Sequence, residues 1–172
     1  GEAKALAKIG QILYSCNEFT EAVEATQKAL EIAEAEQDLL LQGQLKGGLA
    51  ASFQALGDLQ KAHSNWRQAI VLCDQYSSVQ AAEFRVLFAE SLARSVVDKQ
   101  VVQLLKEAER QLQNHPKSLG IMLCTQARIQ LLSGERTAAL QSLEDVQELV
   151  RRFRLQDDQK LQAAIIELRQ EF

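Results

Sequence analysis

The sequence predicts an all-α protein, a right-handed α-solenoid of antiparallel helix pairs. Small and apolar residues recur along the chain at offsets of 40, 39 and 38 residues, and a fixed period of this size is typical of stacked repeats. The small residues of the first helices set the register: Gly10, Ala50, Ala89 and Ala127. Only one proline and eight glycines interrupt the 172 residues, and no stretch shows the period-two alternation of a half-buried strand.

Each helix follows from apolar residues at helical spacing. Leu6, Ile9 and Leu13 fall on one face of the first helix, and a stripe from Phe19 to Ala33 marks the second. We expect nine helices, at 2–15, 18–36, 40–56, 59–76, 79–95, 98–113, 117–133, 136–153 and 157–171.

Specific residues mark the turns. Gly57-Asp58 combines a glycine, which suits a left-handed C-cap, with an aspartate that suits the start of a helix. Gly134-Glu135 repeats this turn. Pro116 separates the third repeat from the fourth, because proline disfavours helix at the residue before it.

The pattern predicts a single domain of four helix pairs over 1–155. Their limits are about 1–38, 39–77, 78–115 and 116–155. Segment 156–172 either caps the repeats or is the first helix of a truncated fifth pair. Because Gly1-Glu2 opens inside a helical pattern without a Met, we expect a piece of a longer protein.

Composition restricts the class of protein. The net charge is −4 and 47% of residues are hydrophobic, which predicts an ordinary soluble domain without a nucleic-acid partner. No apolar run could cross a membrane, and no leader opens the chain, so we expect an intracellular protein, cytoplasmic or nuclear, without a membrane partner. Cys16, Cys73 and Cys124 lie far apart in apolar stretches and are expected to be small buried side chains.

Catalytic patterns are lacking. His63 and His115 have no neighbouring nucleophile motif, and two histidines so placed cannot build a His-rich zinc site. Gly47-Gly48 lies in a helical pattern without the lysine of a phosphate-binding loop. We therefore expect no enzymatic activity, no cofactor and no metal.

The chain resembles tetratricopeptide repeats over nearly its whole length, and the residues of the second repeat show the pattern best. Ala50 to Ala62, with Phe53 and Gly57-Asp58, followed by Trp66 and Ala69, places small residues where paired helices cross and larger ones beside the crossing. These repeats are longer than the usual 34 residues. Long repeats of this sort are similar to those of the kinesin light chain, of spindle-orientation scaffolds and of MalT-type bacterial regulators.

The resemblance implies a concave groove lined by the first helix of each pair, and a protein partner bound there as an extended or helical segment. By register, the predicted groove residues are Lys4, Gln11, Tyr14, Gln44, Gly47, Ala51, Gln54, Glu83, Glu90, Arg94 and Arg128. Gly47 and Gly48 leave the helix bare, to admit either a partner or a neighbouring helix. The alternatives are a structural segment of a large assembly and a ligand-sensing regulatory domain.

One family ligand is excluded by the same register. Chaperone-binding members grip a C-terminal carboxylate with lysine, arginine and asparagine. Here the matching positions hold Ala7, Gln11, Gly48, Glu83 and Leu87, without a cation. We expect no binding to the C-terminal tails of cytosolic heat-shock chaperones.

Overall fold

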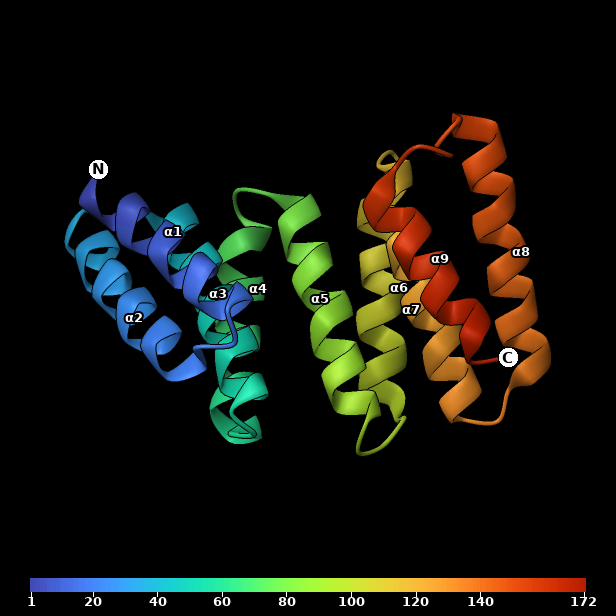
Figure 1. The fold of residues 1–172 in the computed structure, drawn as a ribbon, viewed down its shortest axis with the longest axis horizontal. Helices are drawn as coiled ribbons and strands as arrows, with labels where there is room; N and C mark the ends of the chain where they lie inside the picture. The colour runs from blue at the N-terminus through green and yellow to red at the C-terminus, as the bar shows by residue number, and fades with distance from the viewer. The chain divides into compact units, whose positions relative to one another are not determined.

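The computed structural model describes residues 1–172 and contains helices only (Figure 1). The nine helices pack in sequential antiparallel pairs, which confirms the predicted all-α class. They are α1 (Glu2–Ser15), α2 (Phe19–Ala35), α3 (Leu39–Ala55), α4 (Leu59–Asp74), α5 (Ser78–Ala93), α6 (Lys99–Leu112), α7 (Pro116–Leu132), α8 (Arg136–Phe153) and α9 (Gln159–Gln170). Every end lies within two residues of its predicted position.

Turn chemistry explains this agreement. Gly57 and Gly134 have the left-handed backbone that was predicted, with φ of 81° and 76°. The Asp58 side chain accepts a hydrogen bond from the Lys61 N–H and so caps α4, while Pro116 occupies the first turn of α7. These turn residues therefore fix helix ends at positions that the sequence alone predicts.

The same turn also forms without glycine. Asn17, Gln37 and Arg154 adopt left-handed φ values of 64°, 57° and 54°. At Asn17 the following N–H, that of Glu18, bonds the Leu13 carbonyl 2.9 Å away, and the Asp58 N–H bonds the Phe53 carbonyl in the same way after Gly57. The hydrogen-bonding pattern of the turn thus repeats where its glycine does not.

The chain divides into two compact units, Gly1–Phe84 and Arg85–Phe172, and the boundary falls within α5. Each unit contains a solenoid-like succession of packed helices. The four repeat limits and the single domain stay predictions.

In the N-terminal unit α3 is the central helix. It packs against α1, α2 and α4. Leu41, Leu45 and Leu49 are buried on it and belong to one apolar core with Val23 and Leu30 of α2. Because α3 is covered on several sides, its apolar residues do not form a single stripe.

Glycines let neighbours approach α3 closely. A Cβ added to Gly43 would lie 2.7 Å from the Cys73 sulfur on α4. One added to Gly47 would meet the Phe84 ring of α5, whereas one added to Gly48 would have a single neighbour, Thr26 Cγ2 at 3.7 Å. Two glycines of α3 therefore admit neighbouring side chains, and the third borders open space.

In the C-terminal unit α6, α8 and α9 pack on α7. Leu161, Ile165 and Leu168 of α9 are buried, and Leu161 lies over Gly120 of α7. The packing of α9 on α7 parallels that of α3 on α1. Both roles predicted for segment 156–172 place a helix at such a position.

The prediction of three buried cysteines is wrong for one of them. Cys73 and Cys124 are fully buried, but Cys16 is exposed because it caps the C-terminal end of α1, beyond the face that packs on α2. No helix combines the length and the apolar character that crossing a bilayer requires.

Candidate functional site

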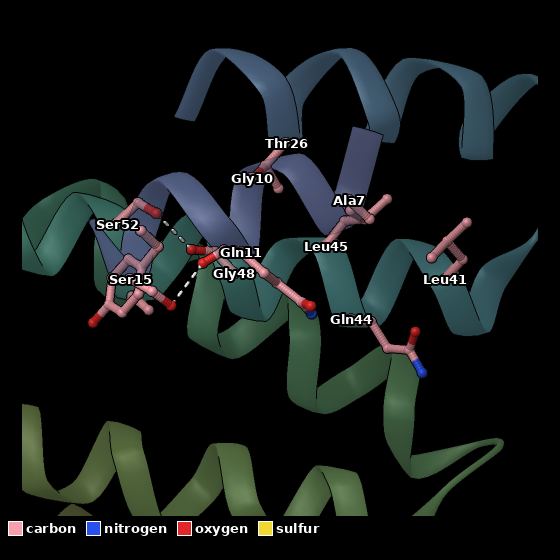
Figure 2. A pocket seen from close by; sticks show the side chains of 12 residues that line it. Ala7, Gly10, Gln11, Ser15, Thr26, Leu41, Gln44, Leu45, Gly48 and Ser52 are labelled. Carbon is pink, nitrogen blue, oxygen red and sulfur yellow. Dashed lines mark hydrogen bonds between the residues drawn. The ribbon is translucent and has the colours of Figure 1, made fainter. Parts of the chain in front are cut away.

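A cavity of about 250 Å³ lies between α1 and α3 in the N-terminal unit (Figure 2). Most of its lining comes from these two first helices, and Thr26 is contributed by α2. The lining residues are Ala7, Gly10, Gln11, Tyr14, Ser15, Thr26, Leu41, Gln44, Leu45, Gly48, Ala51 and Ser52. The cavity contains four of the eleven predicted groove residues, namely Gln11, Tyr14, Gln44 and Ala51.

Small and aliphatic residues form much of this cavity. Leu41 and Leu45 are buried beneath it, and Gly48 leaves its centre without a side chain. The hydroxyls of Ser15 and Ser52 donate to the carbonyls of Gln11 and Gly48 in their own helices, at 2.9 and 3.0 Å (Figure 2). These two polar groups are therefore already satisfied and leave the surface weakly polar.

Other polar groups at the cavity are free to bind. The side-chain amide of Gln11 and the hydroxyl of Tyr14 make no hydrogen bond within the chain, although the Tyr14 ring stacks edge-on with Phe19 at 5.4 Å. The Gln44 amide donates to Gln80 Oε1 at 3.1 Å and keeps its own oxygen as an acceptor. No charged side chain lines the cavity.

Three predicted residues of α1 and α3 lie outside the cavity. Gly47 is buried, and the space beside it is filled by Phe84 of the neighbouring helix α5, which is the second of the two alternatives for this glycine. Gln54 accepts a hydrogen bond from the Trp66 indole N–H at 3.5 Å. Lys4 is exposed on α1.

In the C-terminal unit, the predicted residues contact one another. The Arg128 guanidinium lies 3.7 Å from a Glu90 carboxylate oxygen on α5 and 3.5 Å from a Glu167 oxygen on α9. Arg128 also donates to the Thr125 hydroxyl at 3.3 Å, but its buried Nε has no partner. Opposite charges thus occupy first-helix positions in this unit.

The last two predicted residues join neither group. Arg94 is exposed in the turn after α5, and Glu83 is half-buried in the part of α5 that belongs to the N-terminal unit.

Sequence reasoning missed the deeper lining, notably Thr26, Leu41 and Ser52. The register selects residues that point outward from first helices, whereas Thr26 comes from a second helix and enters through the space left by Gly10. The sequence feature that could have indicated this cavity is the pair of glycines, Gly10 and Gly48, on successive first helices.

The titratable groups do not converge on this cavity. His63 is half-buried on α4, where burial and then the nearby Arg67 lower its pKa, and His115 precedes α7. Burial raises the pKa of the Cys73 and Cys124 thiols to about 11, so both are poor nucleophiles at neutral pH. No three metal-ligating side chains cluster.

Neither a protein-family model nor a curated protein matches the chain. The structure by itself shows a nine-helix protein whose sequential pairs are consistent with a helical repeat.

Proposed function

We propose that this chain is a tetratricopeptide-like protein-interaction module that acts without catalysis and without a cofactor. It binds an extended or helical segment of a protein partner in the groove between α1 and α3. The observation that carries the proposal is the uncharged cavity at that position, bordered by the unpaired Gln11 amide and Tyr14 hydroxyl.

The chemistry of the cavity supports a polypeptide ligand. A peptide offers backbone N–H and C=O groups at regular spacing, which glutamine amides and a tyrosine hydroxyl can bind. An apolar side chain of the ligand would lie against Leu41, Leu45 and the open surface at Gly48. Because the lining carries no charge, an anionic peptide terminus gains no ion pair there.

A selection experiment with a matched control tests this proposal. Peptides would be selected from a random library on the intact protein and measured on two variants. Gly48→Arg places a large side chain in the cavity, where only Thr26 lies near an added Cβ. Ala55→Arg makes the comparable change on an exposed position of the same helix, outside the cavity.

We expect the selected peptides to lose binding to Gly48→Arg and to retain it on Ala55→Arg. Gly47→Arg and Gln54→Ala are unsuitable because they disturb the Phe84 and Trp66 contacts. Peptides that bind Gly48→Arg as well as the parent would contradict the groove assignment.

A second candidate function, a structural segment of a large assembly, has one observation in its favour. Ile9 and Ile12 of α1 are 47% and 58% exposed, whereas Leu49 and Ser52, 40 residues later in the repeat, are 3% and 2% exposed on α3. Substituting Ile9 and Ile12 by lysine would break assembly contacts made by α1 and leave peptide binding unchanged.

A further inference from the structure

A second cavity, of about 310 Å³, lies between α6 and α7 in the C-terminal unit. Its floor includes the buried side chains of Val101, Leu105 and Ile129. This volume is at the lower end of the roughly 300–1,000 Å³ of ligand pockets. No residue of this α6–α7 cleft was predicted from the sequence to bind a partner.

The repeat register explains why this cleft is open. The corresponding contact in the N-terminal unit is between α2 and α3, where Leu30, Leu49 and Phe53 join one apolar core. The matching positions hold Glu109 on α6 and Gln126 and Gln130 on α7. Three apolar side chains that would close the contact are thus replaced by polar ones that line the cleft.

The polar replacements leave apolar side chains of the cleft exposed to solvent. Val23 on α2 is 8% exposed, because it is covered by the core it shares with α3. Its counterpart Val102 on α6 lines the cleft and is 59% exposed. Val97, which lies in the α5–α6 connection and also lines the cleft, is 36% exposed.

The charges at the cleft favour a basic ligand. Glu109 and Glu135 are exposed and make no ion pair within the chain, and Lys106 is the one cation in the lining. Two carboxylates against one ammonium give a net charge of −1. The Gln126 amide is unpaired, while Gln130 Oε1 accepts from the Ser142 hydroxyl at 2.9 Å and keeps its NH₂ group free.

We propose that the α6–α7 cleft is a second interaction surface, which binds a partner segment carrying aliphatic side chains next to a lysine or arginine. The aliphatic side chains replace the contacts that Leu30, Leu49 and Phe53 make in the other unit. The basic side chain reaches Glu109 and Glu135, and the two glutamine amides bond the backbone of the segment. A polypeptide fits better than a small metabolite because Val97 and Val102, which line the cleft, are exposed to solvent and form an open apolar surface rather than an enclosed pocket.

Amide NMR of the intact chain tests this assignment with three blocked pentapeptides. The sequences are Gly-Leu-Lys-Leu-Gly, its charge-reversed form Gly-Leu-Glu-Leu-Gly, and Gly-Ser-Lys-Ser-Gly, which lacks the aliphatic groups. We expect saturable shifts on α6 and α7 from the first peptide, and markedly weaker ones from the other two.

Three variants distinguish specific peptide binding in the cleft from nonspecific contact with the protein surface. Glu109→Gln should weaken binding by roughly two- to fivefold, the range for an exposed ion pair. Glu148→Gln, on an exposed part of α8 outside the cleft, should leave it unchanged. Gln126→Leu introduces the leucine found at the matching position Leu49 and removes one of the two amides that bond the peptide backbone, so it should weaken the shifts while the fold is kept.

Several results would overturn the proposal. These are the absence of saturable shifts, equal shifts from all three peptides, shifts centred on the α1–α3 groove, or binding that survives both Glu109→Gln and Gln126→Leu. Gly48→Arg should not alter the amide shifts that the first peptide causes on α6 and α7. The proposal for the α6–α7 cleft can therefore fail or succeed independently of the proposal for the α1–α3 groove.

Discussion

Adjacent glycines on α3 should respond in opposite ways to the same substitution. Alanine at Gly48 adds a Cβ whose one near neighbour is Thr26 Cγ2 at 3.7 Å, an ordinary van der Waals distance. Alanine at Gly47 adds a Cβ that would overlap the ring of Phe84. That ring is itself held against Trp66, with ring centroids 5.6 Å apart.

The magnitudes follow from two opposing effects. Replacing an interior helical glycine by alanine stabilises by about 0.5–1 kcal/mol. Gly48→Ala should gain that amount. Gly47→Ala gains the same but also overpacks the core, at a cost of about 1–3 kcal/mol. The two variants should therefore differ by about 1–3 kcal/mol in the free energy of unfolding, Gly48→Ala being the more stable.

Urea unfolding measured by tryptophan fluorescence is the direct assay. Trp66 is the only tryptophan and lies in the N-terminal unit with both glycines, so its signal reports on that unit. Both variants should keep the slope of the parent, which shows that the midpoint reflects stability. The packing account would be refuted if Gly47→Ala proved as stable as Gly48→Ala.

Three further predictions concern chemistry. Iodoacetamide at pH 8 should label exposed Cys16 in the native protein, while Cys73 and Cys124 react only after unfolding; mass spectrometry of native labelling at all three sites would contradict their burial. Hydrogen bonds from Lys61 to Asp58, and from the Leu161 N–H and Lys117 to Asp158, lower both carboxyl pKa values. Both ionised carboxylates therefore stabilise the fold above about pH 4, and this stabilisation is lost as the pH falls through the folded pKa. The double variant Asp58→Asn, Asp158→Asn should therefore lose less free energy of unfolding on acidification than the parent. The same dependence of that free energy on pH in both proteins would speak against this. Acidic tail peptides of cytosolic heat-shock chaperones should give no calorimetric binding signal, because no cation lines the α1–α3 cavity.

Helix positions were predictable because their ends depend on local chemistry. Asp58, Gly57 and Pro116 act within a turn or two of their own positions, so the sequence pattern alone locates them. The exposure of Cys16 was not predictable in this way. It follows apolar residues in the sequence, but it lies at a helix end, where nothing packs against it.

The groove was only partly predictable, because helical register gives a direction without showing what lies there. Gln11 and Gln44 both line the α1–α3 cavity, yet Gly47 is covered by Phe84, a residue 37 positions later. The pattern of α3 could not separate Gly47 from Gly48, since this helix is buried on several sides. The α6–α7 cleft could have been predicted from the sequence, because Gln126 stands at the repeat position that Leu49 occupies on α3.

The Glu90–Arg128–Glu167 contacts give the two units different sensitivities to salt. Gln11 and Ala51 occupy the repeat positions of Glu90 and Arg128, but they carry no charge. Added electrolyte screens the Arg128–Glu167 pair, whose Glu167 side chain is 64% exposed, more than the mostly buried Arg128–Glu90 pair, and it leaves apolar burial largely intact. Raised ionic strength should therefore weaken the Arg128–Glu167 link of α7 to α9 while the α1–α3 cavity keeps its shape. A ligand held in that cavity would stay bound across salt concentrations that soften the other unit.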